Sequence, residues 1–185
     1  MGTSLKKVAK KAKDYKYVLM VMRHAKTEPF GNGGDAGREL TDKGRKQAKS
    51  VAKGLASFKL VPDRIACSSA TRARQTCDRM LKVFGDDPKA DYRQSLYEGG
   101  VQSVFDELAQ TKEKRRALLI LGHEPTVSIA CQWIASSESD PTLLDLLNLG
   151  MSPASIAVFG ADESFNQWQL HSGELIALLT AKDFD

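Results

Sequence analysis

An unbroken apolar run at residues 17–22, followed directly by Arg23 and His24, constrains the fold more than any other stretch of this sequence. Consecutive apolar side chains leave no polar face, which is typical of a strand that is buried on both sides. Sheets covered on both faces are mostly parallel and occur in α/β proteins. Such a strand has no structural need for two cationic residues at its end. We therefore expect Arg23 and His24 to meet a negatively charged group.

Helix-like and strand-like segments alternate along the rest of the chain. Each predicted helix has apolar residues at helical spacing, and each predicted strand is a short apolar run between turn residues. The predicted helices cover residues 42–58, 71–84, 101–108 and 127–134. The predicted strands cover residues 17–22, 64–68, 90–92, 117–121, 155–159 and 167–171, with the last two as an antiparallel pair at the sheet edge. This order predicts an α/β sandwich with a largely parallel central sheet flanked by helices.

Cationic or titratable side chains follow three of the predicted strands. Arg23 and His24 follow the first strand, Arg72 lies in the first turn after the second, and His123 follows the strand at 117–121. In open α/β sheets, ligands bind beyond the carboxyl ends of the strands. We therefore expect these four side chains to converge on one anion-binding site.

The positive charge of the chain is concentrated at its start. The formal net charge is +4, yet residues 1–16 alone carry more positive charge than this, so residues 17–185 are nearly neutral. A nearly neutral domain argues against a nucleic-acid-binding surface. We expect residues 1–16 to form a basic tail, solvated in preference to a membrane-surface or targeting role, and residues 17–185 to form a single domain.

Compartment and metal content are constrained by what the chain lacks. No apolar stretch approaches the roughly 20 residues of a membrane helix, and no cleavable signal pattern is present. A cytoplasmic protein with no integral membrane segment is expected. Cys67, Cys77 and Cys131 are too far apart in sequence for a zinc-binding pair, so we interpret them as reduced, buried thiols and expect no metal site.

Two common phosphate-binding motifs are excluded by spacing. The glycine-rich stretch at residues 31–37 is no Walker loop, because Gly44 is followed by Arg45 and not by the required lysine. We expect this stretch to be a mobile surface loop that borders the site. Cys67 precedes Arg72 with one residue fewer between them than a cysteine-phosphatase loop requires. Cys67 is therefore interpreted as a buried strand residue.

Three motifs nevertheless match a known family. They are Arg23 with His24 and Ala25, the stretch 68–76 with Arg72, Ala73, Gln75 and Thr76, and Gly122 with His123. On these motifs the chain resembles the histidine phosphatase superfamily, which includes phosphoglycerate mutases and acid phosphatases. The resemblance covers roughly residues 17–170 and implies a phosphoglycerate mutase-like, three-layer fold.

Within that superfamily the sequence is most similar to the SixA-like phosphohistidine phosphatases. The similarity rests on the small size of the chain and on Lys26, Leu40, Thr41 and Gly44. Two positions depart from the usual family pattern, because Ala25 stands where glycine is common and Ser69 where proline is common.

The resemblance implies a mechanism that agrees with the chemistry of these residues. His24 is expected to attack phosphorus and form a covalent phosphohistidine, which water then cleaves. Arg23, Arg72 and a protonated His123 are expected to bind the phosphoryl oxygens, with no metal or cofactor. Glu98 is the candidate proton donor, and a solvated turn residue is an equally weighted interpretation of it.

The substrate class follows from the short segment between residues 96 and 117, which leaves little chain for a lid. An open site is suited to a phosphorylated protein side chain, so phosphohistidine in proteins is the first expectation. The alternatives are a broad-specificity phosphomonoesterase for small molecules, a phosphoglycerate mutase-like enzyme, and a non-catalytic phosphate or phosphoprotein binding module. The oligomeric state is left open.

Overall fold

The computed structural model describes residues 4–185, and over this range six strands form one sheet in the order β3-β2-β4-β1-β5-β6. The strands are β1 Tyr17–Arg23, β2 Arg64–Ser68, β3 Lys89–Arg93, β4 Ala117–Gly122, β5 Ile156–Ala161 and β6 Glu174–Leu179. Neighbouring strands from β3 to β1 pair in parallel, whereas β5 is antiparallel to both β1 and β6. The predicted, mostly parallel sheet is confirmed.

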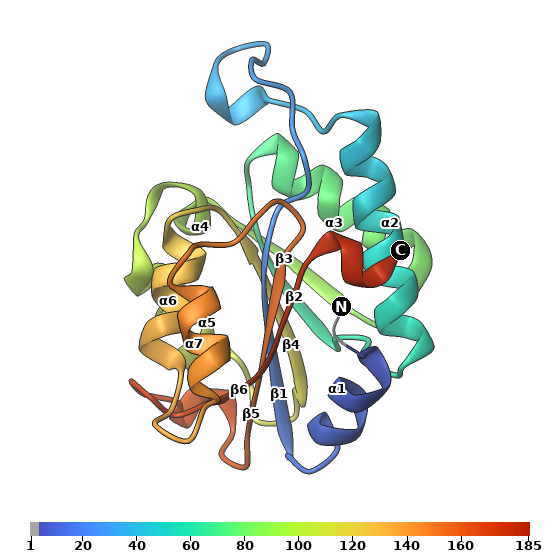
Figure 1. The fold of residues 1–185 in the computed structure, drawn as a ribbon. Helices are drawn as coiled ribbons and strands as arrows, with labels where there is room; N and C mark the ends of the chain where they lie inside the picture. Colours follow the sequence, from blue (N-terminus) through green and yellow to red (C-terminus); the bar gives the residue numbers. More distant parts are fainter. Residues whose placement is uncertain (1–3) are drawn as a thin grey trace.

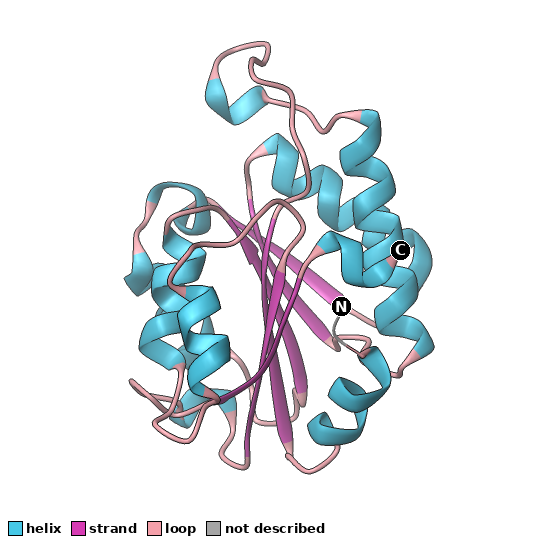
Figure 2. Ribbon diagram, in the orientation of Figure 1, coloured by secondary structure: helices cyan, strands magenta, loops and turns pink. Residues whose placement is uncertain are grey.

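Helices cover both faces of this sheet, which gives three layers (Figures 1 and 2). One face carries α1 Leu5–Ala12, α2 Asp42–Ser57 and α3 Thr71–Phe84, together with the short helix η3 Ala181–Phe184. The other face carries α5 Val101–Gln110, α6 Thr126–Ile134 and α7 Pro141–Leu147. The remaining short helices are η1 Asp35–Gly37, α4 Ser95–Glu98 and η2 Phe165–Gln167.

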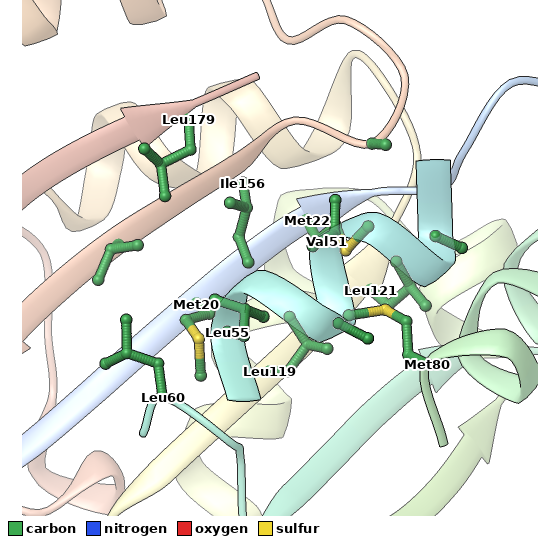
Figure 3. Close-up of a cluster of buried hydrophobic side chains, with 14 of the residues drawn as sticks. Met20, Met22, Val51, Leu55, Leu60, Met80, Leu119, Leu121, Ile156 and Leu179 are labelled. Carbon is green, nitrogen blue, oxygen red and sulfur yellow. The ribbon is translucent and has the colours of Figure 1, made fainter. Parts of the chain in front are cut away.

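The alternation of side chains along β1 divides the core into two clusters. Met20 and Met22 point toward α1, α2 and α3, where Leu119 and Leu121 of β4 join them (Figure 3). Leu19 and Val21 point to the opposite face and pack with α5 and α6. Because successive strand residues face opposite sides, an unbroken apolar run is required to fill both clusters. This is the physical reason for the continuous pattern in the sequence.

Helix α2 begins directly after Thr41, which caps its first turn. The Oγ1 atom of Thr41 accepts a hydrogen bond from the backbone N–H of Gly44 at 3.0 Å, as an N-cap side chain does. Val51 and Leu55 of α2 are fully buried against the sheet. The predicted helix at residues 42–58 is confirmed to within one residue.

The last strand lies later in the chain than predicted. Residues 167–171 were expected to be an edge strand, but they form a turn in which His171 has a φ of 62°, and β6 begins at Glu174. The Nε1–H of Trp168 donates to the carbonyl of Glu163 at 2.8 Å, which fixes the indole in a turn. Leu170 remains 59% exposed. The apparent alternation there reflects a turn anchored by a buried aromatic residue, so this prediction is wrong.

The basic segment at the start of the chain is also different from the expectation. From residue 4 onward it contains α1, whose Val8 and Ala12 are buried in the same cluster as Met20. The side chains of Lys11 and Tyr15 both contact the carboxylate of Glu174 in β6. The prediction of a solvated tail is therefore wrong for residues 4–16, and residues 1–3 of the predicted tail lie outside the described residues. Among residues 4–185, no helix is both long and apolar enough to cross a membrane.

Candidate active site

The parallel sheet brings three strand ends to one edge, and with them the four predicted site residues. His24 follows β1 and His123 follows β4, and these two strands are neighbours. The centres of the two imidazole rings are 5.2 Å apart. Arg72, in the first turn of α3 after β2, places its Nε atom 3.3 Å from Nε2 of His24. Arg23 lies close enough for its charge to lower the pKa of both histidines.

His24 is a buried, neutral imidazole, and the lone pair on its Nε2 accepts a hydrogen bond from Nε–H of Arg72. Its Nδ1 lies 2.8 Å from the carbonyl oxygen of Ala25. Because a carbonyl oxygen only accepts, the proton is on Nδ1, and Nε2 has a lone pair directed at the side of Arg72. Burial, as the largest cause, lowers the pKa of His24 from 6.5 to about 3. At neutral pH this side chain therefore has an unprotonated nitrogen, as a histidine nucleophile requires.

His123 is also kept neutral by its surroundings. Its Nε2 lies 2.7 Å from Oγ of Ser68, which in turn accepts a hydrogen bond from the N–H of Ala70. The Ser68 hydroxyl can donate to or accept from Nε2, according to the tautomer of the ring, and the ring proton of His123 is on Nδ1 when Ser68 donates. Burial and then the charge of Arg72 lower the pKa of His123 to about 4. A protonated His123 was expected from the sequence, whereas the lowered pKa of this side chain favours a neutral ring at neutral pH.

Two buried nitrogen atoms at this site have no hydrogen-bond partner among residues 4–185. They are Nε of Arg23 and Nδ1 of His123. Buried polar atoms are nearly always paired in native proteins, so two orphans in one cluster indicate that a ligand completes them. Nε of Arg23 is an N–H donor, and Nδ1 of His123 is one in the tautomer with Ser68 as donor to Nε2; the ligand that fits two such donors is an anion with several acceptor oxygens.

Arg23 is oriented by contacts through Met151 and Glu124, neither of which was predicted as a site residue from the sequence. Its Nη1 donates to the carbonyl of Met151 at 2.9 Å. The carboxylate of Glu124 accepts from the N–H of Met151 at 3.1 Å and from both the N–H and the hydroxyl of Ser128 at 2.9 Å. Glu124 thus fixes the segment that orients Arg23. Beside Arg23 lies an open cavity of about 560 Å³ that also contacts Leu149.

Asp35 and Tyr97 also lie at the site, although neither was predicted as a site residue from the sequence. Asp35 lies in η1, and its carboxylate accepts from Nη2 of Arg72 at 3.0 Å and from the hydroxyl of Tyr97 at 2.8 Å. The hydrogen bond from Tyr97 is the largest cause that lowers the pKa of Asp35 to about 2. The tyrosine ring lies 5.6 Å from the ring of His123. The glycine-rich loop therefore borders the site, as predicted, but no local signal distinguishes Asp35 from other acidic loop residues.

Glu98 lies next to Tyr97 on α4, yet it faces a different partner. Its side chain is exposed, and its Oε1 accepts a hydrogen bond from Nε2 of Gln94 at 2.7 Å. The tyrosine, and not the glutamate, makes the contacts to the cluster.

Among residues 4–185, no group of three His, Cys, Asp or Glu side chains is arranged to hold a metal ion.

Comparison with known proteins identifies the family. A family model described as the histidine phosphatase superfamily (branch 1) matches residues 19–99. An uncharacterised protein of Mycobacterium tuberculosis is 33% identical over 138 residues, which cover 74% of this chain and 85% of the relative. The chain belongs to the histidine phosphatase superfamily. It is accordingly a phosphatase, and the expectation drawn from its three motifs is confirmed.

Solved structures of this superfamily agree with the fold. One solved structure is described as a candidate phosphohistidine phosphatase SixA from Nakamurella multipartitia. It is 26% identical to this chain, with a TM-score of 0.75 over 88% of this chain and 94% of that one. The protein histidine phosphatase SixA in complex with tungstate is 22% identical, with a TM-score of 0.74 over 91% of this chain and 99% of that one. The histidine phosphatase is thus similar in architecture to SixA proteins, and its predicted phosphoglycerate mutase-like fold is confirmed.

Proposed function

We propose that this phosphatase hydrolyses phosphohistidine in proteins through a covalent phosphohistidine intermediate on His24. One observation carries the proposal: a neutral imidazole has an unprotonated Nε2 that accepts a hydrogen bond from Arg72, beside the guanidinium of Arg23. Nucleophile and anion-binding donors are therefore in place before substrate arrives. Preorganised donors of this kind are usually the largest single contribution to catalysis.

The first step transfers the phosphoryl group to the enzyme. Arg23, Arg72 and the N–H of His123 bind the phosphoryl oxygens, and Nε2 of His24 attacks phosphorus opposite the leaving group. A nitrogen–phosphorus bond to His24 forms while the bond to the leaving atom breaks, and the leaving atom keeps the electron pair. In the second step water attacks phosphorus and the bond from phosphorus to Nε2 of His24 breaks, with its electron pair returning to the ring; both hydrogens of the water stay on the phosphate, so the products are H2PO4− and neutral His24.

The surroundings of the site favour a leaving group that needs no strong acid. The carboxylate of Asp35 is ionised, since its pKa is about 2, and both histidines are neutral. Glu98 is exposed and bound to Gln94. An imidazole leaves phosphorus far more readily than an alkoxide does, so it depends less on a proton donor. These features support phosphohistidine over phosphate esters as the substrate.

The segment between α4 and β4 does not supply a lid for the site. The segment after α4 forms the crossover helix α5, whose Val104 and Leu108 are buried against the sheet. This segment is therefore committed to the core instead of covering the site. Access of this kind suits a side chain on a folded protein as well as a small molecule.

The test compares wild type with His24→Ala on a phosphohistidine peptide, an aryl phosphate and a phosphoglycerate. We expect the highest kcat/KM on the peptide, and an acid-labile phosphoenzyme that is absent from His24→Ala. Arg72→Ala should lower kcat by about 100-fold to 1000-fold, the usual loss for one preorganised donor. His171→Asn is the matched control, because His171 hydrogen-bonds to Ala135, beyond the far end of α6.

Each alternative function predicts a different result. Phosphate binding without turnover would indicate a binding module, and isomerised phosphoglycerate would indicate a mutase. Preference for the aryl phosphate would indicate a broad-specificity phosphomonoesterase. A wild type that hydrolyses the peptide no faster than His24→Ala would refute the proposal.

A further inference from the structure

Asp35 places a negative charge at the edge of an otherwise cationic site. Its side chain is 51% exposed, whereas that of Arg72, its ion-pair partner, is 7% exposed. The carbonyl oxygen of Asp35 accepts from Nη1 of Arg72 at 2.8 Å, and its Oδ2 accepts from Nη2 at 3.0 Å. The carboxylate therefore lies between the phosphoryl-binding arginine and solvent. A substrate group attached to the phosphoryl group has to pass close to it.

The carboxylate is fixed in place and still has capacity to accept. The hydroxyl of Tyr97 and Nη1 of Arg38 donate to it, at 2.8 Å and 3.1 Å. Together with Arg72 these are three donors, and an ionised carboxylate offers about four acceptor positions. A further donor from the substrate is therefore accommodated on its exposed side. An anionic group at the same place is repelled, because like charges at this range interact unfavourably.

We propose that Asp35 is a specificity-determining residue that accepts a hydrogen bond from the ring N–H of the leaving imidazole and disfavours anionic leaving groups. The inference rests on the proposed function, because it concerns the leaving group of the same reaction. The exposed carboxylate, held between Arg72 and Tyr97, is the observation that carries it.

The chemistry of phosphohistidine fits this role without a proton donor. One ring nitrogen carries phosphorus, and the other carries a proton when the ring is cationic. As Nε2 of His24 forms its bond to phosphorus, the bond from phosphorus to the substrate ring breaks and its electron pair stays on that ring nitrogen. The product is a neutral imidazole that retains the proton it already had. Asp35 thus stabilises the cationic, reactive form of the substrate by charge complementarity.

The decisive experiment uses Asp35→Asn, which keeps the shape of the side chain and removes its charge. We expect kcat/KM on the phosphohistidine peptide to fall by about 10-fold or more and that on phosphoglycerate to rise several-fold. The aryl phosphate should change by less than about threefold. Glu28→Gln is the matched control, because Glu28 is exposed on the same loop and loses the same charge. It should leave all three values unchanged.

The readout is a ratio between substrates for one protein sample, so partial misfolding of a variant does not affect it. Equal changes on all three substrates would mean that Asp35 only positions Arg72, and would overturn the inference. If wild type hydrolyses the peptide and Asp35→Asn has the same ratios of kcat/KM between the three substrates as wild type, this inference alone is overturned. Wild type without turnover of the peptide would overturn both this inference and the proposed function.

Discussion

The two site histidines make the stability of this protein sensitive to mild acid. His24 and His123 have pKa values lowered from 6.5 to about 3 and about 4, with burial as the largest cause in both. In the unfolded chain both rings become protonated as the pH falls through about 6.5, while in the folded chain they stay neutral. Between these values the unfolded state binds more protons, so the free energy of unfolding falls as the pH falls.

The size of the effect follows from these pKa values. Between about pH 7.5 and about pH 5, each histidine is expected to remove about 2 kcal/mol from the free energy of unfolding, or about 4 kcal/mol together. This is a large share of the roughly 5–15 kcal/mol that stabilises a typical domain. Asp35, with its pKa lowered to about 2 from 3.8, destabilises the fold only at lower pH, outside this window.

The assay is urea unfolding followed by circular dichroism at several pH values across this window. His24→Asn keeps a donor for the carbonyl of Ala25 and removes the titrating ring, so about half of the acid-induced loss should disappear. The double variant that also carries His123→Asn should lose nearly all of it. A wild type that loses less than about 1 kcal/mol over this range would refute the reasoning. So would a His24→Asn variant with the full wild-type loss.

Three further predictions concern the scaffold, and each is checked by urea unfolding. Glu107→Ala should lower the free energy of unfolding by about 3 kcal/mol, because it removes the buried carboxylate that lies 2.9 Å from the guanidinium of Arg64. Gly44→Ala should cost about 1–3 kcal/mol, because the new Cβ would lie 2.0 Å from the carbonyl oxygen of Lys26; an unchanged stability would contradict this contact. Val8→Ala should cost about 2 kcal/mol if α1 is part of the folded domain, whereas a solvated helix would tolerate it without loss.

The sequence by itself determined the parallel part of the sheet and the centre of the site, but not the position of the last strand. Short continuous apolar runs between turn residues indicate strands buried on both faces, and parallel strands place their carboxyl ends along one edge. That geometry is enough to bring His24, Arg72 and His123 together, although they are far apart in the chain. The neutral state of the two histidines was only partly foreseen, because burial depends on everything that packs around them.

Only the tertiary structure decided what surrounds that centre. Sequence periodicity shows which side of a helix or strand is apolar, but the path of a loop depends on partners that are remote in the chain. The contact of Asp35 with Arg72 and Tyr97 is of this kind, as is the packing of α1 on the sheet. On the single turn of α4, a difference of one residue sends Tyr97 toward the site and Glu98 into solvent. Local pattern identified His24, Arg72 and His123 as site residues to be tested, whereas long-range packing selected the residues that surround them.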